Sequence, residues 1–175
     1  MSKLYVDNIA SKTGSTDAMT IDSSGHTFLK LPHFLIRNTT AQNILNATYV
    51  RAEFNDAVLD THNFADLTNN KIVFNATTAG VYQVNFGGKL QHATANRVGY
   101  WLRKEGSMST GPYIGYFEIG KTTSTYAYPT FNFIYQFNSG DFLELDMYHD
   151  QGSTLATYPQ SQAIGFFMSG FRIGG

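Results

Sequence analysis

The residue types that most often carry chemistry are sparse and scattered in this sequence. No two of its histidines are spaced i,i+2 or i,i+4, and no His-Glu-x-x-His motif occurs, so their spacing does not predict a metal site. Nucleophile-elbow, P-loop and dinucleotide-binding motifs are also absent. The sequence therefore predicts no catalytic residue, no cofactor and no enzymatic activity. The histidines are His26, His33, His62, His92 and His149.

Four carboxylates lie close together in the later part of the chain, at Asp141, Glu144, Asp146 and Asp150. Calcium needs several oxygen ligands, which makes this stretch the one to test for a cation site. Glu144 and Asp146 alternate outward on one predicted strand, and two such side chains cannot enclose an ion. No metal is therefore predicted. The sequence also does not single out any pair of carboxylates for glycoside hydrolysis.

Two polar loops contain tyrosines suited to binding a surface. Residues 121–129 combine threonine and serine with Tyr126 and Tyr128, and residues 154–161 do the same with Tyr158. Tyrosine offers rigid contact area with a polar tip, which suits carbohydrate or protein partners. We predict that these three tyrosines bind a receptor. The alternative is that they fill gaps between strands or subunits.

Composition excludes several classes of partner. Only 14% of the 175 residues are charged, against about 25% in an average protein, whereas 15% are aromatic. The formal net charge of -1 predicts no nucleic-acid binding, and the absence of cysteine excludes disulfides. The N-terminus lacks the apolar core of a signal peptide, and no stretch approaches the ~20 apolar residues that span a bilayer. Neither membrane insertion nor signal-directed export is predicted.

Alternating apolar residues predict strands throughout the chain. Lys71–Leu90 reads as strand, turn and strand, with Tyr82, Val84 and Phe86 on one face, which predicts a hairpin. Residues 128–137 and 142–149 flank a tight turn at Ser139-Gly140 and predict a second hairpin. No segment shows a helical period, and residues 38–70 predict only short strands and loops. About ten short strands separated by turns are typical of an all-β sandwich or jelly roll.

The last strand, residues 163–173, is apolar on both faces. Phe166 and Met168 share one face, while Phe167, Phe171 and Ile173 share the other. A strand without a polar face predicts the sheet core on one side and a partner subunit on the other. A charge on the outer side, Phe171→Asp, is predicted to block assembly, while Arg103→Ala is predicted to leave it intact.

The first 31 residues differ from the rest because they are rich in serine, threonine, aspartate and glycine. Alternation around Leu4–Val6 and Met19–Ile21 predicts two short strands that bury little alone. Pro32 marks the predicted boundary, so residues 1–31 form an arm and residues 32–175 a head. The arm is either a frayed terminus or a segment that becomes ordered against other chains.

Three motifs in the head together resemble the C1q/TNF-like family. They are AGVYQVNF at residues 79–86, SGDFLELDMYHDQG at residues 139–152 and AIGFFMSGFRI at residues 163–173, in the order in which that family carries them. The resemblance implies an antiparallel β-sandwich jelly roll that assembles as a homotrimer. It places the trimer interface at Tyr82, Phe167, Phe171 and Ile173.

The arm resembles the start of bacteriophage fibre and appendage proteins, through KLYVDNIASKTGSTDAMTIDSSG at residues 3–25. This resemblance implies a virion protein whose residues 1–31 dock onto other capsid, tail or fibre proteins. The predicted function is a non-enzymatic trimeric knob that binds a host-surface glycan or protein. A decoration protein that stabilises the capsid or tail is the alternative, and a glycan-active enzyme is a more distant one.

Overall fold

The computed structural model describes residues 8–10, 17–29, 31–91, 97–104, 113–120, 126–128, 130–157 and 166–175. The chain divides into two compact units, Met1–Pro32 and His33–Gly175. The described residues form strands and turns without any helix, so none of their elements is a helix able to cross a membrane. The absence of helices agrees with the sequence prediction.

The N-terminal unit contains a three-stranded antiparallel sheet of β1 (Asn8–Ala10), β2 (Asp17–Ile21) and β3 (Thr27–Leu29). The predicted strand at Met19–Ile21 lies within β2, whereas the one predicted around Leu4–Val6 falls outside the described residues. Asp22 shapes the turn after β2, because one carboxylate oxygen accepts hydrogen bonds of 2.9 Å from the backbone N–H groups of Ser24 and His26. These bonds lower the pKa of Asp22, the bond from His26 most strongly.

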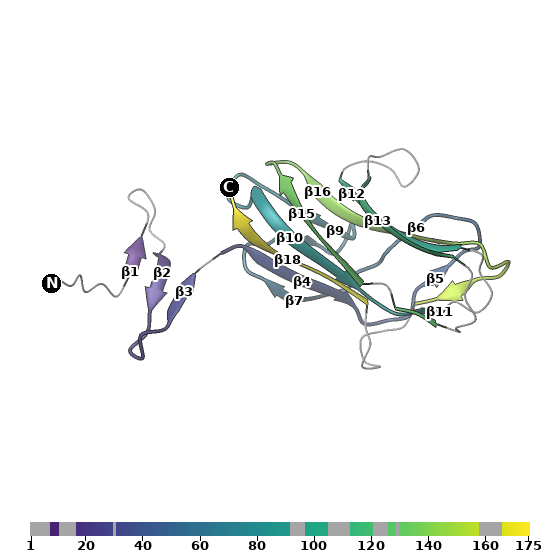
Figure 1. Cartoon of the computed structure of the whole chain (residues 1–175), viewed down its shortest axis with the longest axis horizontal. Coiled ribbons are helices and arrows are strands. Elements are labelled where there is room, and N and C mark those ends of the chain that lie inside the picture. Colours follow the sequence, from purple (N-terminus) through teal and green to yellow (C-terminus); the bar gives the residue numbers. More distant parts are fainter. Residues whose placement is uncertain are drawn as a thin grey trace. The chain divides into compact units, whose positions relative to one another are not determined.

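The second unit is a sandwich of two antiparallel sheets (Figure 1). The five-stranded sheet has the order β15-β10-β18-β4-β7, and the six-stranded sheet has the order β13-β12-β16-β9-β8 with β6 also pairing β16. The five-stranded sheet consists of β15 (Thr130–Phe137), β10 (Gly80–Gly87), β18 (Phe166–Gly174), β4 (His33–Asn38) and β7 (Asp56–Asp60). The six-stranded sheet consists of β13 (Tyr113–Gly120), β12 (Arg97–Lys104), β16 (Phe142–His149), β9 (Lys71–Val73), β8 (Ala65–Asp66) and β6 (Val50–Arg51).

Two short two-stranded pairings complete the described part of this unit. They are β11 (Leu90–Gln91) with β14 (Tyr126–Ala127), and β5 (Asn43–Ile44) with β17 (Leu155–Ala156).

The core lies between the inner faces of the two large sheets. Every second residue of β10 is buried, as the period of two predicted, and the same alternation buries Phe166 and Met168 on β18. The six-stranded sheet contributes alternate residues of β12 and β16. Burying an aromatic or branched side chain of this kind stabilises the fold by about 1.5–3 kcal/mol. These inner residues of β12 and β16 are Val98, Tyr100, Leu102, Leu143, Leu145 and Met147.

Lys71–Leu90 does not form the predicted hairpin. Its first strand, β9, pairs with β16 and β8, and its second, β10, pairs with β15 and β18 in the other sheet. The turn between them therefore crosses from one sheet to the other. Asn75 fixes this crossing, because its side-chain oxygen accepts hydrogen bonds from the backbone N–H groups of Thr77 and Thr78.

The second predicted hairpin is also wrong, for the same reason. β15 belongs to the five-stranded sheet, and β16, which follows the turn at Ser139-Gly140, belongs to the six-stranded one. Alternation shows which side chains face the core. It does not show whether two successive strands pair edge to edge or stack face to face across that core.

Gly80 is required where β10 begins. Its φ is +151°, and a Cβ atom there would lie 2.5 Å from the Arg172 side chain and 2.6 Å from the Gly174 carbonyl oxygen. The start of β10 can therefore pack against the end of β18 only with glycine at this position.

Residues 38–70 form short strands and loops, as predicted, and amide side chains hold this irregular region together. The Gln42 amide donates to the Arg51 carbonyl oxygen and accepts from the Glu53 N–H, at 2.6 and 2.9 Å. Asn70 accepts a 2.9 Å hydrogen bond from the N–H of Phe54. Backbone groups without strand partners are satisfied in this way.

His149, at the end of β16, connects this region to the six-stranded sheet. Its ring is buried, and Nε2 donates a 2.7 Å hydrogen bond to the Ile44 carbonyl oxygen. Burial lowers the pKa of His149 below its ordinary value of 6.5. The unfolded chain therefore binds this proton more readily than the folded chain does.

We predict that acidification below pH 6.5 weakens the fold through His149. Relative to a His149→Gln variant, which cannot titrate, the wild-type free energy of unfolding should fall as the pH drops through this value. Chemical denaturation of both proteins at a series of pH values measures the difference between their free energies of unfolding. The contributions of the other titrating groups are common to both proteins and cancel in this difference. A difference that stays constant with pH contradicts the prediction.

Candidate functional site: the outer face of the five-stranded sheet

The outer face of the five-stranded sheet is defined by the residues of its strands that point away from the core. One row across this face consists of His33, Phe171, Gln83 and Ile134, which are register neighbours on β4, β18, β10 and β15. Phe171 is 43% exposed and Ile134 is 62% exposed. Large apolar side chains therefore face outward from the middle of the sheet and from its β15 edge.

The next row differs in polarity along its length. It starts with Leu59 and Leu35 at the β7 edge and continues through polar Ser169, Asn85 and Asn132. Within this row the apolar part is thus confined to the β4–β7 end. The two ends of the outer face consequently present different surfaces, with leucines at one end and Ile134 at the other.

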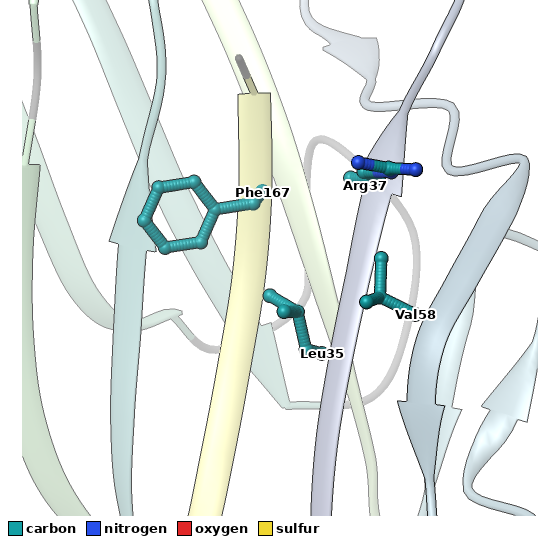
Figure 2. A pocket seen from close by; sticks show the side chains of 4 residues that line it. All are labelled: Leu35, Arg37, Val58 and Phe167. Carbon is teal, nitrogen blue, oxygen red and sulfur yellow. The ribbon is translucent and has the colours of Figure 1, made fainter. Parts of the chain in front are cut away.

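Shallow hollows lie around Phe167 on this face. One of them has a volume of about 240 Å³ and is lined by Leu35, Arg37, Val58 and Phe167. Figure 2 shows these four side chains. A second, of about 400 Å³, is lined largely by the neighbouring apolar residues, including Leu59 and Phe171. A surface of this kind fits an apolar side chain of another molecule better than it fits solvent.

The hollow of Figure 2 owes part of its shape to an irregularity in β7. The pairing of β4 with β7 shifts between Leu35 and Ile36, where Leu35 faces Leu59 and Ile36 faces Ala57. Val58 is the extra residue, and it is exposed beside Leu59. Arg37 at the rim is neutralised by Asp56, whose carboxylate lies 2.5 Å from Nε. The hollow therefore combines an apolar floor with a rim at which the charge of Arg37 is balanced by Asp56.

The residues predicted for a trimer interface separate into two groups. Phe167, Phe171 and Ile173 alternate with buried Phe166 and Met168, so they lie on the outer face; their contact with another subunit stays a prediction.

Tyr82 requires a correction. Its side chain is 0% exposed, and its hydroxyl donates a 2.6 Å hydrogen bond to the Thr78 carbonyl oxygen. Burial raises the pKa of Tyr82 to about 12. Its side chain fills the core of its own chain and is not available to another subunit. A glycine-x-tyrosine motif cannot by itself distinguish the two faces of a strand.

The predicted receptor-binding tyrosines are described only in part. Tyr128 is 50% exposed, and the ammonium group of Lys89 lies 5.8 Å from the centre of its ring. Tyr126 belongs to β14, where it pairs with Gln91. Tyr158 falls outside the described residues. The binding role of all three stays a prediction.

Glu144 and Asp146 point outward on β16, as predicted, but both are buried on the six-stranded sheet. Arg51 contacts Glu144, and its Nε lies 3.8 Å from Asp146, while Arg103 contacts the other oxygen of Asp146. Burial raises the pKa of both carboxyl groups, and the nearby guanidinium groups oppose that effect. We call these four side chains the charge cluster.

The other carboxylates considered for calcium also have protein partners. Asp141 lies 2.9 Å from the ammonium group of Lys104, and Asp150 accepts a 2.7 Å hydrogen bond from the N–H of Arg97. Within the described ranges, no group of three or more histidines or acidic residues is arranged to hold a metal ion.

Four residues of the outer face were not predicted: Leu35, Val58, Leu59 and Ile134. Leu35 on β4 and Ile134 on β15 are each the one apolar residue in an otherwise polar outward set, and the inner sets of both strands are mostly apolar. That signal is present in the sequence and could have identified them. Val58 and Leu59 carry no such signal, because the bulge in β7 disrupts the alternation.

Comparison with solved structures identifies the architecture. The crystal structure of murine APRIL at pH 5.0 matches with a TM-score of 0.62 and 10% identity, over 82% of this chain and 99% of that chain. The globular domain of a zebrafish complement 1qA protein matches with a TM-score of 0.56 and 14% identity, over 81% and 97%. This chain has the C1q/TNF-like jelly-roll fold. Eiger TNF from S. frugiperda is similar as well, with a TM-score of 0.57 and 9% identity over 82% and 93%.

The resemblance that the head motifs indicated is thus confirmed for the jelly-roll fold. No protein-family model matches the sequence, and no curated protein matches it significantly. At these identities the similarity extends to the fold alone, and function depends on the surfaces of this particular jelly roll.

The charge cluster makes Arg103 unsuitable as a neutral control for assembly. Asp146 is 0% exposed, so removal of its guanidinium partner leaves a carboxylate buried without that partner. We predict that Arg103→Met lowers the free energy of unfolding by about 3–5 kcal/mol. Urea denaturation measures the loss.

Two control variants accompany this measurement. Glu118→Gln removes the partner of Arg97 from an exposed ion pair and should leave stability nearly unchanged. Arg103→Met combined with Asp146→Leu removes both charges and should recover most of the loss. If the double variant is no more stable than Arg103→Met alone, the pairing does not explain the effect.

Proposed function

We propose that this chain is a non-enzymatic structural protein of a tailed bacteriophage. In this proposal it forms a homotrimeric knob on the virion. Residues 1–31 attach it to another virion protein, and the jelly-roll head presents a surface for host binding. The apolar outer face of the five-stranded sheet is the observation on which the proposed assembly rests.

The layout of the outer face supports a closed ring of subunits. A ring with three-fold symmetry is built from heterologous contacts, in which one patch of each subunit meets a different patch of the next. The outer face offers two such patches, the hollow beside Leu35 and Val58 and the exposed side chains of Phe171 and Ile134. Contact between these patches would cover the large apolar residues that a single copy leaves in water.

The virion location rests on the sequence of the arm. Its similarity to the start of phage fibre and appendage proteins is the reason to place it there, and the short three-stranded sheet of β1 to β3 provides few apolar residues of its own. Such a unit gains stability from a partner surface. Attachment to a larger virion protein would supply that surface.

Host recognition is proposed for the loops around Tyr126, Tyr128 and Tyr158. Tyr128 lies immediately before the residues that lead into β15 and leaves half of its surface open to a partner. The nearby ammonium group of Lys89 adds a hydrogen-bond donor. This combination suits a host-surface glycan or protein.

Phe171→Asp should convert the trimer into monomers, because a charge would have to be buried in the subunit interface. Multi-angle light scattering measures the mass, and circular dichroism verifies that the variant is folded. Tyr116→Asp is the matched control: Tyr116 is 61% exposed but lies on the other sheet, so this variant should remain trimeric. A monomeric wild type, or a trimeric Phe171→Asp, contradicts the proposed assembly.

Tyr128→Ala should reduce adsorption of the purified trimer to host cells without changing its mass. Binding of fluorescently labelled wild-type and variant protein to host cells measures the effect. Immunogold labelling of assembled particles then locates the protein. Label at the tail together with adsorption supports the knob, whereas label over the capsid lattice without adsorption supports the decoration alternative.

A further inference from the structure

The outer face of the six-stranded sheet carries an exposed pair of tyrosines on its edge strand, β13. Tyr113 and Tyr116 are 57% and 61% exposed. Their rings lie 5.8 Å apart and cross at 84°. We call them the tyrosine pair. They lie on the sheet opposite the proposed subunit interface, so the proposed assembly does not explain their exposure.

An aromatic layer lies next to the tyrosine pair in the sheet. Trp101 on β12 is the register neighbour of Tyr116, and its indole lies over Gly99, where a Cβ atom would come within 2.2 Å of the ring. Tyr49 contacts the indole edge-on at 5.0 Å, and Tyr148 does so at 6.1 Å. The glycine therefore lets the indole lie flat on the sheet, beside the tyrosine pair.

The charges around this layer are balanced within the protein. The guanidinium group of Arg97 lies 4.5 Å from the centre of the Tyr148 ring and 3.9 Å from Glu118. Deeper in the face, the two arginines of the charge cluster contact its two carboxylates. Among the described residues this face thus offers matched cations and anions, and it gives no electrostatic preference for a nucleic acid, an anionic lipid or an acidic peptide.

We infer that this face binds an uncharged carbohydrate chain along β13. Sugar rings combine apolar C–H faces with many hydroxyl groups, and exposed tyrosines complement both through their rings and their hydroxyl groups. Glu118 can accept hydrogen bonds from hydroxyl groups next to the tyrosine pair, and Arg97 can donate them. The balanced charges select a neutral chain over a sulfated or phosphorylated one. This site is distinct from the Tyr128 loop and does not depend on the proposed virion location.

Native electrophoresis in gels that contain a polysaccharide tests the inference on the full-length protein. The probes are dextran, laminarin, yeast mannan and soluble starch as neutral chains, with dextran sulfate as the anionic comparison. The wild type should be retarded by at least one neutral polysaccharide, equally at low and high salt. Tyr113→Ala combined with Tyr116→Ala should abolish the retardation, while its circular dichroism spectrum stays that of the wild type.

Leu45→Ala is the control, because Leu45 is 56% exposed in a loop away from β13 and belongs to none of the proposed binding surfaces. It should be retarded like the wild type. The inference is overturned if no neutral polysaccharide retards the wild type, if only dextran sulfate does, or if the double variant is retarded equally. Loss of retardation in Leu45→Ala would also overturn it, because the effect would then not be specific to the tyrosine pair. If light scattering shows that the wild type is a monomer, the proposed trimer is wrong. The carbohydrate inference is unaffected by that result.

Discussion

The sandwich depends on two neighbouring connections between its sheets, one from β9 to β10 and the other from β15 to β16. Phe74 and Phe137 stack across the core with ring centres 4.0 Å apart and an angle of 4° between their planes. The backbone joins the two crossings as well, because Phe74 donates to the Asp141 carbonyl oxygen and accepts from the Gly140 N–H, both at 2.8 Å. Tyr82 packs edge-on against both rings. Together these contacts hold β9 and β16 in the six-stranded sheet and β10 and β15 in the five-stranded sheet.

The two sheets share a core, and their outer faces are chemically different. The outer face of the five-stranded sheet exposes aliphatic and phenylalanine side chains around shallow hollows. That of the six-stranded sheet combines tyrosines, a tryptophan and matched ion pairs. An apolar face is suited to permanent burial by another copy, whereas a tyrosine-rich face with balanced charges is suited to reversible contact with a hydrated partner. The proposed trimeric knob would use both kinds of surface.

The charge cluster shows how a strand can be buried on both faces without being apolar on both. β16 presents Leu143, Leu145 and Met147 to the core and Glu144 and Asp146 to the opposite side. Arg51 arrives from β6 and Arg103 from the neighbouring strand β12, so the carboxylates are covered by their own counter-ions. In sequence these residues look like the exposed set of a half-buried strand. Their burial depends on Arg51, which lies far from them along the chain.

The sequence by itself determined the fold class and the facing of most strands, because a period of two follows directly from backbone geometry. It also identified the closing strand as apolar on both faces, with Phe167 and Phe171 outward. It could not assign strands to sheets, since Lys71–Leu90 and the segments around Ser139-Gly140 carry the same local pattern whether they pair or cross the core. Long-range contacts decided that assignment, together with the burial of Tyr82 and the pairing of Asp146 with Arg103. Such contacts join residues that lie far apart along the chain, so no local sequence pattern predicts them.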